Sequence, residues 1–253
     1  DFGYKSSKTG FSFGSGFEFY DDLYWNTGIS SYIDKLETNS SASTTMKKQE
    51  GSYFDSFFNQ TFSYDKRNQR YKTTDGFISR FSQNIPIISD TYTLTNSYDY
   101  KKYNQWLGEN ILSLGFYIKS TNSLNGDNVK LSDRLMLPSS KLRGFEVGKV
   151  GPKDGTSFIG GNYASSVNIA TTLPQILPSL QNTNFSLFLD AANIWGIDYS
   201  TSLTDESKIR SSIGIAVDFY TPVGPLNFSL TEPITKGKND IIETFRFNLG
   251  TTF

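Results

Sequence analysis

Bulky apolar residues alternate with small or polar residues along most of the chain. Successive side chains of a β-strand point to opposite faces, so this period of two predicts strands with one apolar and one polar face. The apolar residues that share one parity within a segment are Phe11, Phe13, Phe17 and Phe19; Phe54, Phe58, Phe62 and Tyr64; Tyr92, Leu94, Tyr98 and Tyr100; Leu112, Leu114, Phe116 and Ile118; Ile213, Ile215, Val217 and Phe219; Leu226, Phe228 and Leu230.

Alternation is less regular over four more segments, 23–34, 77–87, 163–172 and 185–195, and it returns in the last residues of the chain. The expected total is therefore about eleven strands. Each is near the roughly 9–11 residues that cross a bilayer as a tilted strand. No run of about 20 apolar residues, as a membrane helix would need, occurs. The fold class predicted is therefore all-β.

The two faces of these strands differ in kind. Aromatic residues make up 15% of the chain, although its mean hydropathy is −0.41 and the second face carries mostly Gly, Ser, Thr and Asn. A soluble sandwich would fill its inner face with Val, Leu and Ile. A wide apolar face is costly in water, which favours contact with lipid. We expect a transmembrane antiparallel β-barrel, with a soluble β-rich binding module as the alternative that detergent-free solubility as a monomer would favour.

The connections differ in length. Short turns are expected at 21–22, 88–90 and 222–225 at one end of the barrel, and longer polar loops at 38–52, 65–75, 198–209 and 235–241 at the other. The longest loop, 120–160, shows little alternation. Such segregation is typical of outer-membrane barrels.

Composition excludes several chemistries. The chain has no cysteine and no histidine, which removes a thiol nucleophile, a Ser-His-Asp triad and the usual ligands of transition metals. A net charge of −1 argues against nucleic-acid binding. The acidic pairs, such as Asp21-Asp22, are expected to be solvated. We therefore expect no enzyme activity, no cofactor and no metal site.

The loop carries three glycine-containing motifs: Leu142-Arg143-Gly144-Phe145, then Gly151-Pro152, then Gly160-Gly161-Asn162. Further motifs follow in the segment from Phe188 to Trp195, which includes Asp190, and in 210–216 and 221–226. In this order they resemble the BamA-type outer-membrane insertases. Leu142 stands where that family usually has Val or Ile, and Ala192 where it usually has Gly. The resemblance is dense over about 130–253 and thinner before.

The resemblance implies that residues 1–253 are the C-terminal part of a barrel of about sixteen strands, holding about the last eleven. Periplasmic POTRA domains and the first strands would precede Asp1. The loop 120–160 would fold into the barrel. Its Arg143 would pair with an inward carboxylate, and Asp190 lies on the polar parity of its strand. The family often adds a Glu on the preceding strand; the matching position here is placed near Ala170, without a carboxylate.

Further expectations concern particular residues. Gly144 would allow positive φ at the loop tip, and Phe145 would be a packing anchor. Tyr98, Tyr100, Tyr103 and Trp106 are expected in an interfacial girdle. The final strand, with Phe245, Phe247, Leu249 and Phe253, resembles the C-terminal sorting signal of outer-membrane proteins.

The function implied is folding and insertion of outer-membrane proteins, in the bacterial outer membrane, through a seam between first and last strands. Its partners would be unfolded outer-membrane protein clients, outer-membrane lipids and accessory lipoproteins. The alternatives are a TamA-like factor, a two-partner secretion pore, and a general porin-type barrel or receptor.

Overall fold

The computed structural model describes residues 2–70, 72–174, 182–199, 203, 205, 207–221 and 224–249. Eleven strands form one antiparallel sheet in chain order, which confirms the expected number. They are β1 (Tyr4–Tyr20), β2 (Leu23–Thr38), β3 (Gly51–Asp65), β4 (Gly76–Ser89), β5 (Thr93–Gln105), β6 (Ile111–Ser123), β9 (Tyr163–Thr172), β10 (Thr183–Trp195), β11 (Arg210–Thr221), β12 (Gly224–Thr235) and β13 (Phe245–Leu249).

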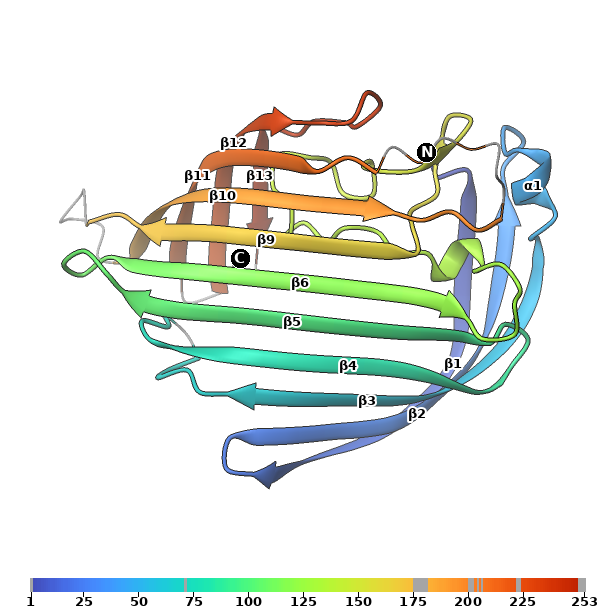
Figure 1. Cartoon of the computed structure of the whole chain (residues 1–253), viewed down its shortest axis with the longest axis horizontal. Coiled ribbons are helices and arrows are strands. Elements are labelled where there is room, and N and C mark those ends of the chain that lie inside the picture. Colours follow the sequence, from blue (N-terminus) through green and yellow to red (C-terminus); the bar gives the residue numbers. More distant parts are fainter. Residues whose placement is uncertain are drawn as a thin grey trace.

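The sheet is strongly curled, and its C-terminal strands turn behind the central ones (Figure 1). Its two edges are β1 and β13, which do not pair with each other, so the described part of the chain forms an open barrel wall. The long connection 124–162 lies between β6 and β9 and contains a 3-10 helix (Leu131–Asp133) and the small hairpin of β7 (Lys153–Asp154) and β8 (Ser157–Phe158). A single turn of helix, α1 (Thr44–Lys47), lies between β2 and β3.

The parity predicted from the sequence sets the outer face of the wall. Phe13 is 74% exposed, and apolar residues of the same parity on the other strands are also exposed. Rings on neighbouring strands stack on this face: the ring centroids of Trp25 and Phe62 lie 5.7 Å apart, and the two ring planes are nearly parallel. Because no core covers these rings, the outer face is suited to contact acyl chains.

The connections alternate strictly between two ends of the sheet, because every strand runs antiparallel to its neighbours. We call the end with the connection 124–162 the loop end, and the other the turn end. The prediction was wrong at two places: 66–75 lies at the turn end with 21–22, and the short turn after Ser89 lies at the loop end. Length alone does not decide the end of a connection.

The interior is only partly polar, although the second face of the strands carries mostly small and polar residues. The connection 124–162 packs against the wall and forms an apolar core beneath the loop end. This core comprises Tyr117, Leu135, Leu137, Leu142, Phe145, Val150, Ala164, Ala192 and Ile194. Inward-facing alanines leave room for the loop's larger side chains, so water is excluded there.

Candidate functional site

The tip of the loop, residues 142–145, lies against the inner face of the wall. Gly144 has φ +85°, and a Cβ at this position would lie 2.5 Å from Cγ2 of Thr231 on β12. Only glycine combines this left-handed backbone with so close an approach. Leu142 and Phe145, on either side of the tip, are 3% and 2% exposed and belong to the apolar core. The tip is therefore docked.

Docking places the guanidinium of Arg143 on Asp190 of β10. Nε of Arg143 lies 2.7 Å from Oδ2, and Nη2 lies 2.7 Å from Oδ1, which makes a bidentate ion pair. The backbone N–H of Arg143 donates to the same carboxylate at 3.1 Å. The guanidinium carbon also lies 3.4 Å from the centroid of the Phe188 ring. The cation is thus held by both charge and stacking.

Two neutral residues complete the surroundings of this pair. Nδ2 of Asn168, on β9, donates to Oδ1 of Asp190 at 2.8 Å and to the carbonyl of Lys141 at 3.0 Å. Ser212 on β11 donates to the carbonyl of Arg143 at 2.7 Å. The strand register pairs Asp190 with Asn168, and Ala170 lies two residues further along β9, opposite Phe188. An amide, with no charge, stands at the position across from Asp190.

Burial decides what this arrangement can do. Both charged side chains are nearly inaccessible to water. Removing one member of a buried pair leaves the other charge uncompensated, which typically costs about 3–5 kcal/mol. The geometry therefore fits a lock that holds the loop on the wall.

The remaining glycine motifs lie in residues 151–162, the part of the loop that returns to the wall, which we call the returning limb. They bring this limb close to β10. Gly151 has φ +97° and packs on Ile194. Pro152 is buried, and its carbonyl accepts a hydrogen bond from the backbone N–H of Ile159 at 3.1 Å. Gly160 passes against the backbone of Leu135, and Gly161 against that of Trp195.

Asn162 and Trp195 mark the point where the loop re-enters the wall. Asn162 accepts from Arg134 at 3.0 Å and donates to Asp198 at 2.8 Å. The Trp195 ring stacks on Tyr163 of β9 at 5.7 Å. These contacts fix both limbs of the loop against the start of β9 and the end of β10.

The loop tip also contacts the segment that leads into the edge strand β13. Phe145 pairs with Ile242 in an isolated antiparallel bridge, and the backbone N–H of Glu146 donates to the carbonyl of Ile241 at 2.9 Å. Nη2 of Arg246 on β13 donates to the carbonyl of Phe145 at 2.6 Å. Sequence reasoning missed Arg246, although its inward parity between Phe245 and Phe247 was a usable signal.

Other buried cations were also missed. Arg210 on β11 makes an ion pair with Asp240, 2.9 Å from Nε to Oδ2, and Asp240 accepts from the backbone of Gly151 at 3.2 Å. Arg134 in the loop is paired with Asp198. Burial lowers the pKa of Arg134, and the charge of Asp198 opposes that shift. The described loop is thus held by several charge pairs besides the one at Arg143.

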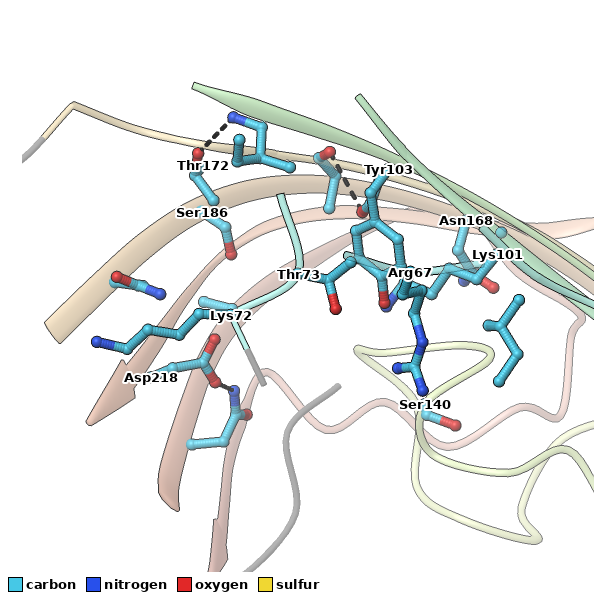
Figure 2. Close-up of a pocket in the computed structure, with 18 of the residues that line it drawn as sticks. Arg67, Lys72, Thr73, Lys101, Tyr103, Ser140, Asn168, Thr172, Ser186 and Asp218 are labelled. Carbon is cyan, nitrogen blue, oxygen red and sulfur yellow. Dashed lines mark hydrogen bonds between the residues drawn. The ribbon is translucent and has the colours of Figure 1, made fainter. Parts of the chain in front are cut away.

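A polar cavity of about 420 Å³ lies beside the tip toward the turn end (Figure 2). Arg67, Lys72 and Thr73 enter it from the connection 66–75, and Asp218 faces it from β11. Lys72 reaches across to the Tyr220 ring, 4.7 Å from its centroid. Tyr103 also lines the cavity, so its expected place in the outer girdle was wrong. This cavity is a water-accessible part of the interior.

The final strand presents its apolar parity outward. Phe245, Phe247 and Leu249 are 55%, 50% and 64% exposed. Phe253 lies outside the described residues. Within the described ranges, no group of three or more acidic side chains is placed to hold a metal ion. Likewise, no helix there is both long and apolar enough to cross a bilayer.

Residues 2–253 match the Omp85 superfamily domain. The outer membrane protein assembly factor BamA of Neorickettsia risticii is 23% identical over 257 residues, covering 99% of this chain and 34% of that protein. A crystal structure of BamA from Haemophilus ducreyi lacking POTRA domains 1-3 is 25% identical, with a TM-score of 0.82, and the match covers 96% of this chain and 54% of that one.

CdiB from Acinetobacter baumannii matches with a TM-score of 0.62 at 10% identity, over 97% of this chain and 42% of that one, a likeness of fold alone. The chain thus spans about a third of the curated relative and about half of the BamA structure. These matches confirm the resemblance seen in the motifs, the antiparallel barrel fold and the location in the bacterial outer membrane. The chain belongs to the Omp85 superfamily.

Proposed function

We propose that this chain forms part of the barrel wall of a factor that folds and inserts outer-membrane proteins. In this proposal it acts through its edge strand β13 and catalyses no covalent reaction. The observation that carries the proposal is the docked tip, which contacts both Asp190 and the start of β13. The named BamA relatives are assembly factors, and they resemble this chain more closely in sequence than CdiB does.

The edge of β13 supplies the physical basis. Among the described strands β13 pairs only with β12. In this proposal the other side of β13 supplies the backbone donors and acceptors that an incoming strand uses. Unpaired backbone groups are costly in hydrocarbon and can template an incoming strand by β-augmentation. In this proposal the partners are unfolded outer-membrane protein clients at the edge, lipids at the outward rings, and accessory lipoproteins that complete the complex.

Site-specific photo-cross-linking in vesicles that contain the protein tests the proposal. A cross-linker at Phe247, on the outer face of β13, should capture the last strand of an unfolded client barrel. The matched outward position Phe116 on central strand β6 should not. Equal capture at the two positions, or capture at neither, would contradict a role for the edge.

The alternative within the superfamily is a secretion pore, which the CdiB likeness favours on fold alone. A secreted chain would pass through the interior, so it should be captured by a cross-linker at Ser82, whose side chain faces inward beside Thr61. Capture at Ser82 but not at Phe247 would replace assembly by secretion as the proposed function.

A further inference from the structure

Another buried cation, Lys130, lies near the start of the loop. The ammonium of Lys130 lies 2.8 Å from Oδ2 of Asp55 on β3 and 3.0 Å from Oδ2 of Asp34 on β2. Asp133 of the loop follows at 3.6 Å. Lys130 is 3% exposed, and the two strand carboxylates are fully buried. Such a charge is stable only because its partners are in place.

Other contacts fix the same segment, residues 129–134, which we call the loop root. The backbone N–H of Leu131 donates to Gln49 at 3.0 Å, and Tyr4 of β1 donates to the Leu131 carbonyl at 3.0 Å. Ser132 donates to Asp34 at 2.5 Å. The middle of the root is therefore seated on β1 to β3, and the tip is seated on β10 to β13. The two ends of the root, Val129 and Arg134, bond to Asp198, which follows β10.

Packed chain connects root and tip. Leu135, directly after the root, forms an antiparallel bridge with Gly161 and belongs to the same apolar core as Leu142 and Phe145. A displacement of the root would have to move Leu135 and with it this core, because close-packed interiors do not deform locally without loss of contact.

Both seats use the same charge pattern. At each, the loop contributes the cation and the wall contributes the carboxylate: Lys130 on Asp34 and Asp55, and Arg143 on Asp190. The two seats lie in different parts of the wall, on β2–β3 and on β10. The loop therefore bridges two separate parts of the wall.

We propose that Lys130 is a positioning residue, which holds the loop root on β2 and β3 and thereby keeps Arg143 aligned with Asp190. The proposal concerns the seating of the loop. It does not depend on the assembly function, and its test does not use client assembly.

The absence of cysteine from the chain allows a direct test. Ser212 is fully buried under the tip, and Ser212→Cys is close to isosteric, so a water-soluble maleimide should label it only when the tip leaves. Ser157→Cys, 2% exposed in β8, reports on the returning limb near Gly3. Labelling rates are measured for each reporter in the folded protein in detergent.

Lys130→Met is expected to raise labelling of Ser212→Cys at least tenfold. The same change at Lys48, an exposed lysine just after α1, is the matched control and should leave the rate unchanged. Adding Asp34→Asn and Asp55→Asn to Lys130→Met removes the uncompensated charges and should restore most of the protection.

Two outcomes would overturn the proposal. In the first, Lys130→Met exposes Ser157→Cys but leaves Ser212→Cys protected, so the two seats are independent. In the second, neither reporter responds. Retained heat-modifiable mobility on gels establishes that each variant is folded. If Lys130→Met alone does not fold, the test moves to the triple variant with Lys130→Met, Asp34→Asn and Asp55→Asn. A triple variant that does not fold, or that does not protect Ser212→Cys, would overturn the proposal.

Discussion

The carbonyl of Phe145 accepts a hydrogen bond from the guanidinium of Arg246, so the loop tip and the edge strand β13 share a contact. Nε of Arg246 also lies 2.9 Å from Oε2 of Glu243, which places the same side chain across the segment before β13. Backbone bonds from Glu146 to Ile241 and from Glu243 to Gly144 flank the contact. Movement of the loop end of β13 is thus coupled to the tip.

Arg246→Met should loosen this contact. A hydrogen bond to a charged group is worth about 1.5–3 kcal/mol, so the protection of the flanking backbone amides should fall by a corresponding factor. Hydrogen exchange of the Glu146 and Glu243 amides measures this. Arg80→Met, an inward cation on β4 that lines the cavity, is the control. Unchanged exchange in Arg246→Met would show that the backbone bridge alone holds the segment.

Removing either member of the buried pair should unfold the loop seat. Arg143→Met and Asp190→Asn should each lower the free energy of unfolding by about 3–5 kcal/mol, and the double variant by clearly less than their sum. Denaturant unfolding of the four proteins gives the coupling energy. Arg143→Lys should recover only part of the stability, because an ammonium cannot make the bidentate contact. Additive losses would mean that the two residues act separately.

Gly144→Ala should destabilise the tip for two separable reasons. Its φ of +85° disfavours any side chain, and its new Cβ would press on Cγ2 of Thr231. The expected loss is of the order of 1–3 kcal/mol. Adding Thr231→Ser removes the crowding methyl but not the backbone strain, so unfolding midpoints should recover in part. Full recovery, or none, would show that only one of the two causes operates.

Local periodicity was enough to predict the wall and the face on which Asp190 lies. The parity of residues such as Phe13 and Ile213 gave the outer face, and the parity of Asp190 gave its inward direction. The pairing with Arg143, however, came from the family resemblance. Period-two alternation reports which face a side chain is on, and this is decided within a few residues.

The loop's own packing could not be predicted in this way. Lys130 and Asp55 are 75 residues apart, and the loop has no repeat from which to infer that they meet. Tyr103 has the same chemistry as Tyr98 and Tyr100 but the opposite parity, and the expectation that grouped the three in one girdle overlooked that difference. The dry core beneath the loop forms because inward residues such as Ala164 and Ala192 are small enough to let the loop pack on them. In the sequence these alanines cannot be told apart from small residues that face water.

The cluster at the loop root also predicts a pH effect. Burial raises the pKa of Asp133, and the charges of Lys130 and Lys8 offset part of that shift. Asp34 on β2 and Asp55 on β3 complete the charges around it. Because the folded pKa lies above the unfolded one, the stability that protonated Asp133 contributes is full below the unfolded pKa. It is lost as the pH rises through the folded pKa.

Asp133→Asn should therefore raise the thermal unfolding midpoint at pH 8 and leave it nearly unchanged at about pH 3, where the native residue is already protonated in both states. Unfolding curves at the two pH values measure the difference. Asp127→Asn, at an exposed carboxylate of the same loop, controls for general surface charge. A lower midpoint at pH 8 would show that attraction from Lys130 and Lys8 outweighs burial, which reverses the sign of the predicted effect.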